Sequence, residues 1–322
     1  MRNPVVRARL GATTLVAAVT LALTACGGAA EQAAPSEAGA SSDASFPRTV
    51  EHAMGSTEIP ARPERIVVLD TGELDSALSL GVPPAGAVTT DVSSGFLSYL
   101  AEGAAGVEEV GTIGEPNLEA IAALEPDLIL SNKVRHEDLY GTLSRIAPTV
   151  FAEKVGAVWK DNFRLAAEAL GLEEQAESAL EEYGRDAAAL GESIGDPAGT
   201  TVSALRFVEG SIRVYTPASF IGTVLGDIGL DQLELPTAEV PTFAQLSAEE
   251  LTRADADIVL YSSYGPVAES GEATALAGPL WPRLGAVRAD RAFAVEDDVF
   301  FTGIGLTAAT LMIEDLQAQL AG

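Results

Sequence analysis

The chain has 322 residues, a formal net charge of −28 and a hydrophobic content of 47%. This length suits two domains of ordinary size, and the hydrophobic content is sufficient for real cores. The acidity argues against nucleic acid as a partner, because binding to phosphates needs a basic face. It does not exclude a small anionic ligand, since local arginines can make a positive pocket in an acidic protein.

The N-terminus carries the most specific local signal. Basic residues precede an uncharged apolar run at residues 10–23, and Leu23-Thr-Ala-Cys26 follows. The run is short for a membrane span and is typical of a secretory signal with a cleavage site of small residues. The site resembles the bacterial lipobox, whose cysteine is lipidated and becomes the mature N-terminus. We therefore expect a signal peptide at 1–25 and lipidation at Cys26, the only cysteine; the alternative is an ordinary secretory signal with an incidental cysteine.

Residues 26–45 are rich in Ala, Gly, Ser and Glu and have few large apolar side chains. This composition predicts a disordered tether. The folded body would then be extracytoplasmic and lipid-anchored to the outer face of the cell membrane. That location argues against catalysis that needs ATP or a nicotinamide cofactor.

From residue 46 the pattern alternates between strands and helices, which favours an α/β fold with mainly parallel sheets. We expect, in order, a hairpin at 46–60, a strand at 63–69, a helix at 73–80 ended by Gly81, a strand at 82–88, a short helix at 96–100 and a strand at 109–113. No dinucleotide fingerprint, phosphate-binding loop or hydrolase elbow accompanies these elements.

Residues 114–135 then form a helix–strand unit. Asn117 is a suitable N-cap, the apolar spacing at 118–124 is helical, and Pro126 ends the helix. A buried strand follows at 127–130, and the chain leaves it at 131–135, where open α/β sheets bind ligands.

A second copy of the unit lies at residues 246–260. Glu119 is eight residues before Asp127, and Glu249 is eight before Asp257. The repeat predicts two similar lobes whose strand ends face a shared cleft. Chance is the alternative, because an acid followed by an apolar run is common in α/β proteins.

Between the copies and after them the alternation continues. We expect a first lobe at 46–171, a connecting helix at 172–195 and a second lobe at 196–322. The helical periodicity at 172–190 predicts a helix that joins the lobes, with packing on the first lobe as the alternative. The other expected elements are a helix at 136–143, a strand at 146–151, a helix at 159–170, strands at 200–208 and 212–215, a helix at 220–228, a helix and strand at 249–254 and 258–260, and a closing helix at 306–320.

Several stretches in this order resemble the iron–siderophore substrate-binding lipoproteins of ABC importers. They are Pro63-Glu-Arg-Ile-Val-Val-Leu69, Leu80-Gly-Val-Pro83, Glu115-Pro-Asn-Leu-Glu119, Arg135-His-Glu-Asp-Leu-Tyr140, Ile146-Ala-Pro-Thr-Val150, Leu205-Arg-Phe207, Val214-Tyr215 and Pro279-Leu-Trp281. The resemblance covers nearly everything from Thr49 onward. It implies an α/β, class III periplasmic-binding-protein-like fold: two lobes, each with a mainly parallel sheet flanked by helices, joined by one long helix.

The resemblance also implies the chemistry. A ferric siderophore saturates its own iron, so the protein needs no metal ligand and no cofactor; it offers aromatic walls and cationic donors to anionic oxygens. Arg206 is the main candidate, since this family commonly places a cleft arginine in that strand, and Arg135 is the second. A surface salt bridge is the alternative for Arg206.

Aromatic candidates for the wall are Trp159 and Tyr215, for which core packing is the alternative, and Tyr264, which follows its strand as Val134 follows the first. Trp281 and Phe301 are weaker candidates. Some hydroxamate binders of this kind carry an arginine where this chain has Ile113, so their arginine pattern does not transfer. A hydroxamate or carboxylate siderophore remains the favoured ligand.

The resemblance further implies that Glu119 and Glu249 dock on arginines of an ABC permease, and we expect the protein to be a monomer. Solvated helix charge is the ordinary alternative for both glutamates. Haem or cobalamin capture by the same architecture, or a structural surface lipoprotein, remain as other functions. Capture of bare zinc or manganese needs more ligands than His52 and His136 offer. An enzyme is disfavoured because no nucleophile–base motif is present.

Overall fold

The computed structural model describes residues 45–92, 95–237 and 241–320. The expected signal peptide, the lipidation site Cys26 and the expected tether up to residue 44 lie outside these residues. Within them, no helix is both long and apolar enough to cross a membrane.

The body opens with an antiparallel hairpin of β1 (Arg48–His52) and β2 (Gly55–Ile59). Next comes a five-stranded sheet of order β5-β4-β3-β6-β7 in which every described pair is parallel. Its strands are β3 (Ile66–Val68), β4 (Gly86–Thr89), β5 (Glu108–Thr112), β6 (Leu128–Asn132) and β7 (Thr149–Ala152). β3, β4, β6 and β7 are buried throughout, as expected for a parallel sheet covered on both faces.

Helices α1 (Thr71–Ser79), α2 (Leu118–Ala123), α3 (Lys133–His136), α4 (Tyr140–Leu143) and α5 (Trp159–Leu170) belong to this first part of the chain. Asn117 caps α2 as predicted, because its side chain accepts the N–H groups of Glu119 and Ala120, both at 3.1 Å.

The second sheet is mixed. Its order is β11-β9-β8-β12-β13, and β10 also pairs with β8. The strands are β8 (Thr201–Val208), β9 (Ser211–Tyr215), β10 (Asp231–Gln232), β11 (Phe243–Leu246), β12 (Ile258–Ser263) and β13 (Ala292–Ala294). β10, β12 and β13 lie in parallel pairs, whereas β9 is antiparallel to β8 and to β11. The short helices α8 (Val267–Ser270), α9 (Glu272–Ala277) and α10 (Gly285–Arg288) accompany this sheet.

The two predicted copies of the helix–strand unit occupy corresponding places. β6 lies between β3 and β7, and β12 lies between β8 and β13. Asp127 accepts the N–H of Arg65 just before β3, and Asp257 accepts the N–H of Thr201 at the start of β8. Each aspartate therefore ties a central strand to the beginning of its neighbour.

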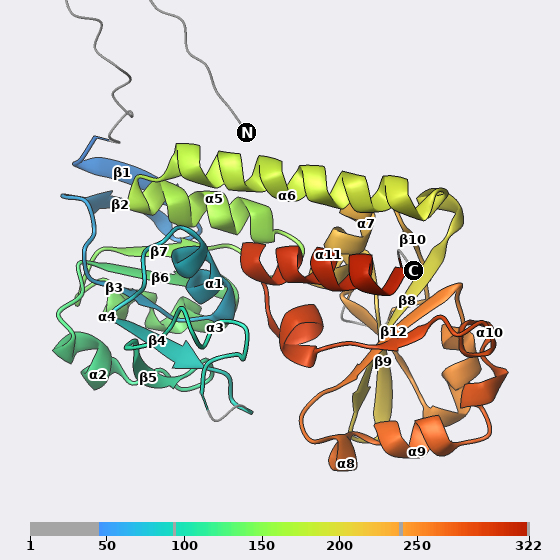
Figure 1. Cartoon of the computed structure of the whole chain (residues 1–322). Helices are drawn as coiled ribbons and strands as arrows, with labels where there is room; N and C mark the ends of the chain where they lie inside the picture. The colour runs from blue at the N-terminus through green and yellow to red at the C-terminus, as the bar shows by residue number, and fades with distance from the viewer. Residues whose placement is uncertain (1–44, 93–94, 238–240, 321–322) are drawn as a thin grey trace, which may run out of the picture. The chain divides into compact units, whose positions relative to one another are not determined.

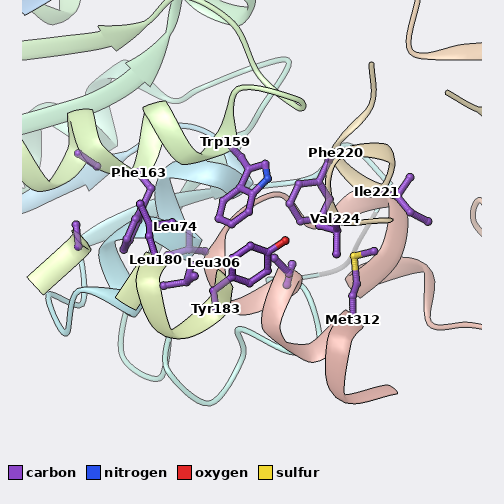
Figure 2. Packing of buried hydrophobic residues seen from close by; sticks show 14 of the residues in the cluster. Leu74, Trp159, Phe163, Leu180, Tyr183, Phe220, Ile221, Val224, Leu306 and Met312 are labelled. Carbon is purple, nitrogen blue, oxygen red and sulfur yellow. The ribbon is translucent and has the colours of Figure 1, made fainter. Parts of the chain in front are cut away.

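One long helix, α6 (Glu173–Ile194), connects the two sheets, and it packs against α5, α7 (Phe220–Ile228) and α11 (Leu306–Leu320) (Figure 1). Gly171 separates α5 from α6 with a φ of 72°, a left-handed conformation that suits glycine. The core in this region is continuous: Figure 2 shows Trp159, Tyr183, Phe220 and Met312 together in one cluster.

Polar contacts cross this helical layer. The indole N–H of Trp159 in α5 donates to the Thr223 hydroxyl in α7 at 3.1 Å. Asp227 of α7 accepts from Lys160 at 2.6 Å and from the hydroxyl of Tyr183 at 2.7 Å.

Asp75 of α1 caps the N-terminus of α11. This fully buried carboxylate accepts the N–H groups of Thr307 at 2.9 Å and Ala308 at 3.1 Å, and the hydroxyl of Tyr99 at 3.1 Å. The N-terminus of a helix carries unsatisfied N–H groups and partial positive charge, so a carboxylate there is stabilising. Burial raises the pKa of Asp75, and these hydrogen bonds partly offset the increase.

Three expected helices differ from the structure. Residues 96–100 form turns, because the Ser98 N–H and the Tyr99 hydroxyl are used in contacts with distant acids. The helix expected at 136–143 is divided into α3, a 3-10 helix (Glu137–Leu139) and α4. The helix of the second copy is a 3-10 helix, Ala248–Ala254, with a capping box between Ser247 and Glu250.

Candidate functional site

A polar group lies at the carboxyl end of the first sheet. Asn132, the last residue of β6, donates from its amide to Asp70 at 3.0 Å and to Glu73 at 3.2 Å. Arg135 donates to Asp70 at 3.2 Å, and its side chain is 42% exposed. Asp70 also accepts the N–H of Thr71 at the start of α1. Arg135 is thus already paired with an acid, and its exposed side faces solvent.

Glu73 is the perturbed acid of this group. Burial, and then the neighbouring charge of Asp70, raise the pKa of Glu73 to about 8, while the amide of Asn132 opposes the increase. Two adjacent buried carboxyl groups are not readily ionised together, so Glu73 keeps its proton at neutral pH.

Beside this group is a narrow pocket of about 20 Å³, enough for a water molecule. Asp70, Glu73 and Ser131 contribute its polar lining, and Trp159, Ile304 and Gly305 contribute from other elements. The size excludes a siderophore from this pocket.

His136 is buried below the same strand end. Its Nδ1 lies 2.7 Å from the Ser131 hydroxyl, and its Nε2 lies 2.8 Å from the Ile113 carbonyl oxygen. Since a carbonyl only accepts, Nε2 donates to Ile113, and in a neutral ring Nδ1 then accepts from the Ser131 hydroxyl. Both nitrogens are occupied, so His136 holds the loops together and has no free position for a ligand.

A second group lies near the carboxyl end of β8. Arg206 is 5% exposed and donates from Nε to Asp297 at 2.7 Å. Its terminal nitrogens contact the other Asp297 oxygen, the Thr302 hydroxyl and, at 3.4 Å, the Tyr215 hydroxyl. Burial alone would lower the pKa of Arg206, but Asp297 and Tyr215 outweigh it and the pKa is raised. Arg206 is therefore a fixed cation.

Aromatic rings surround this arginine. Its guanidinium lies 4.3 Å from the ring centre of Tyr264 and 5.7 Å from that of Phe301. Tyr215 lies between Phe301, at 4.9 Å, and Phe243, at 5.9 Å. The guanidinium of Arg213 is 4.5 Å from the ring centre of Phe243. Arginine can pair with the oxygens of an anionic ligand, and aromatic rings can pack against its apolar parts.

The structure brings three of the predicted ligand residues together, Arg206, Tyr215 and Tyr264, and adds the weaker candidate Phe301. Arg135 belongs to the group on the first sheet, and no described contact joins it to Arg206. Trp159 is only 2% exposed and packs on Tyr183 and Phe220, which suits a core residue better than a wall. Trp281 packs against Tyr261, outside both groups.

Two residues of this group, Asp297 and Arg213, are not among those predicted from the sequence. Asp297 lies 91 residues beyond Arg206, and no local pattern marks it. Arg213 had a signal, because the strict alternation in Ile212-Arg-Val-Tyr215 places it on the same face as Tyr215.

Glu119 and Glu249 are both exposed, and the carboxylate of neither has a hydrogen bond or ion pair with another described residue. Glu250, by contrast, pairs with Arg253. No group of three or more His, Cys, Asp or Glu side chains in the described part of the chain could hold a metal ion.

Comparison with known proteins shows which family the chain matches. The family described as "Periplasmic binding protein" matches residues 66–299. The "Probable siderophore-binding lipoprotein YfiY" of Bacillus subtilis is 38% identical over 84% of this chain and 86% of its own length. The "Achromobactin-binding periplasmic protein" of Dickeya dadantii is 30% identical over 79% of this chain and 85% of its own.

Among solved structures, SirA of Staphylococcus aureus in complex with staphyloferrin B superposes with a TM-score of 0.74. It is 30% identical, and the match covers 85% of this chain and 98% of that one. The iron-uptake system-binding protein FeuA of Bacillus subtilis, at 21% identity and a TM-score of 0.71, shares the fold.

Proposed function

The chain belongs to the periplasmic binding protein family, and from this premise we propose that it captures a ferric siderophore and delivers it to an ABC permease for iron uptake. Its relatives are named as lipoproteins or periplasmic proteins, and the chain is extracytoplasmic. The family consists of substrate-binding proteins, and this member is a binding protein and no enzyme. A hydroxamate or carboxylate siderophore is the favoured ligand.

The observation that carries this function is the arginine–aromatic group on the second sheet. Arg206 is held among Tyr215, Tyr264 and Phe301, so a fixed cation and an aromatic surface are in place before a ligand arrives. Preorganisation of this kind lowers the entropy lost on binding. Arg135 contributes from the first lobe, and Trp159 supports the site from the core. Iron arrives inside the siderophore, and the protein supplies neither a metal ligand nor a cofactor.

We also propose how the protein is held at the cell surface and how it meets the permease. Lipidation of Cys26 anchors the protein to the outer face of the membrane, since a lipidated N-terminal cysteine supplies more than one acyl chain. Glu119 and Glu249, which are exposed and unpaired among the described residues, dock on arginines of the permease. The protein acts as a monomer, with one glutamate presented by each lobe.

The test is a titration of the chain from Gly27 onward, which lacks only the leader and the lipidation site. Ferric siderophores of several chelating classes, haem and cobalamin are added in turn, and binding is followed by its heat and by the fluorescence of Trp159 and Trp281. Saturable quenching by one ferric siderophore is expected. Quenching by haem or cobalamin alone would replace the ligand, and no response to any compound would refute the proposed function.

A further inference from the structure

Arg206 has few donors left for a ligand. A guanidinium carries five N–H groups. Asp297 takes two of them, and Thr302 and Tyr215 take one each. The charge is also compensated by the Asp297 carboxylate in a buried pair. Arg206 can therefore give a ligand one hydrogen bond at most, without a free positive charge.

Arg213 has the opposite character. It lies directly opposite Arg206 in the antiparallel ladder of β8 and β9, so both side chains are on the same face of the sheet. It is half-buried, and no ion pair or side-chain hydrogen bond joins it to another residue that the structure describes. Two arginines placed opposite each other repel, and Asp297 relieves this repulsion by neutralising Arg206. One uncompensated positive charge remains, on Arg213.

The surroundings of Arg213 suit a ligand contact. The guanidinium lies over the Phe243 ring, which favours a cation there, and none of its N–H groups is used in a hydrogen bond with another described residue. Tyr215, two residues along β9 on the same face, extends the aromatic surface from Phe243 to Phe301. The other candidate cation, Arg135, is paired with Asp70.

We propose that Arg213 is the arginine that binds the anionic oxygens of the siderophore, while Arg206 and Asp297 are positioning residues that hold the aromatic surface beside it. This inference rests on the proposed function and assigns the ligand contact within it. The planar fork of Arg213 fits a pair of oxygens, as a carboxylate or a deprotonated hydroxamate presents, and the adjoining part of the ligand lies on Phe243 and Tyr215.

The experiment compares three variants by titration with the ferric siderophore that the wild type binds most tightly. Arg213→Gln is expected to weaken binding about tenfold to a hundredfold, because charge-assisted hydrogen bonds are lost. Arg213→Lys keeps the charge without the fork and should be intermediate. Arg291→Gln is the matched control: this half-buried arginine lies at the amino ends of the strands of the same sheet, near Thr201 and Asp257, and its loss should leave affinity unchanged.

Melting temperature separates the two roles. Arg206→Gln should lower it, because the Asp297 carboxylate is left without its partner, whereas Arg213→Gln should leave it unchanged. Raised salt should weaken siderophore binding by the wild type more than by Arg213→Gln. If Arg213→Gln lowers the melting temperature, the test rests on Arg213→Lys, whose siderophore affinity should still be lower than that of the wild type.

Affinity of both Arg213 variants equal to that of the Arg291 control would overturn the inference and leave the proposed function intact. A wild type that binds no siderophore in the panel would overturn both.

Discussion

Glu73 is an acid that the folded protein keeps neutral, and this sets a pH dependence. Its carboxyl group titrates near pH 8 in the folded chain against an ordinary value of 4.5. As the pH rises from 4.5 towards 8, the unfolded chain releases this proton and the folded chain keeps it, so stability falls. Below pH 4.5 both states are protonated and the contribution is constant.

Glu73→Gln should therefore flatten the decline of melting temperature between pH 5 and pH 8 and raise the melting temperature at pH 8 by a few degrees. The glutamine keeps an oxygen for Asn132 and has no proton to lose. Some decline remains, since burial also raises the pKa of Asp75. Glu182→Gln, on the exposed side of α6, is the control. Parallel pH profiles for wild type and Glu73→Gln would contradict this assignment of the proton.

At the scale of the element, α6 contains two glycines with opposite surroundings. A Cβ on Gly191 would lie 2.2 Å from the carbonyl oxygen of Ile228 at the end of α7, which is far inside contact distance. A Cβ on Gly184 would meet nothing within 4 Å. The close approach of α6 to α7 therefore depends on Gly191 and does not depend on Gly184.

Gly191→Ala should lower the free energy of unfolding by about 1–3 kcal/mol, because the helices must separate. Gly184→Ala should raise it by up to about 1 kcal/mol, because alanine favours the helix. Urea denaturation of both variants measures the difference. A stabilised Gly191→Ala would show that the two helices are not in close contact.

The elements that the sequence predicts best are those with long apolar periodicity. The expected helices at 159–170, 220–228 and 306–320 agree with α5, α7 and α11 in both bounds. Residues 96–100 have a helix-like pattern too, but Tyr99 and Ser98 are held by Asp75 and Asp298 from far along the chain. The site divides in the same way. The sequence singled out Arg206, Tyr215 and Tyr264, whereas it missed Arg213, and Asp297, 91 residues beyond Arg206, is joined to that arginine only by folding.

At the scale of the whole molecule, the joined helical layer predicts little lobe closure. Trp159 and Lys160 of α5 bond to Thr223 and Asp227 of α7, and Tyr183 of α6 shares Asp227. A hinge that bends widely would have to break these bonds. Small-angle scattering should give nearly the same radius of gyration with and without siderophore. A fall as large as that of hinge-bending binding proteins would contradict this rigidity.

Reversing the charge of Glu119 and Glu249 tests whether these residues dock on the permease. The double variant Glu119→Arg, Glu249→Arg should lose iron uptake in cells and keep its siderophore affinity in solution, because both residues are exposed and unpaired among the described residues. Glu182→Arg on α6 is the matched control and should keep uptake. Normal uptake by the double variant would remove the two glutamates from the docking surface.

When the chain emerges outside the cytoplasm with its N-terminal part first, Asp75 arrives long before Thr307, whose N–H it accepts across 232 residues of chain. Until α11 arrives, this carboxylate lacks two of its donors, and an ionised group in that condition stays hydrated rather than entering a dry core. The first lobe thus stays partly open to water until the rest of the chain has emerged. The two lobes finish folding together, and a chain cut short before α11 is a substrate for proteases rather than a smaller working receptor.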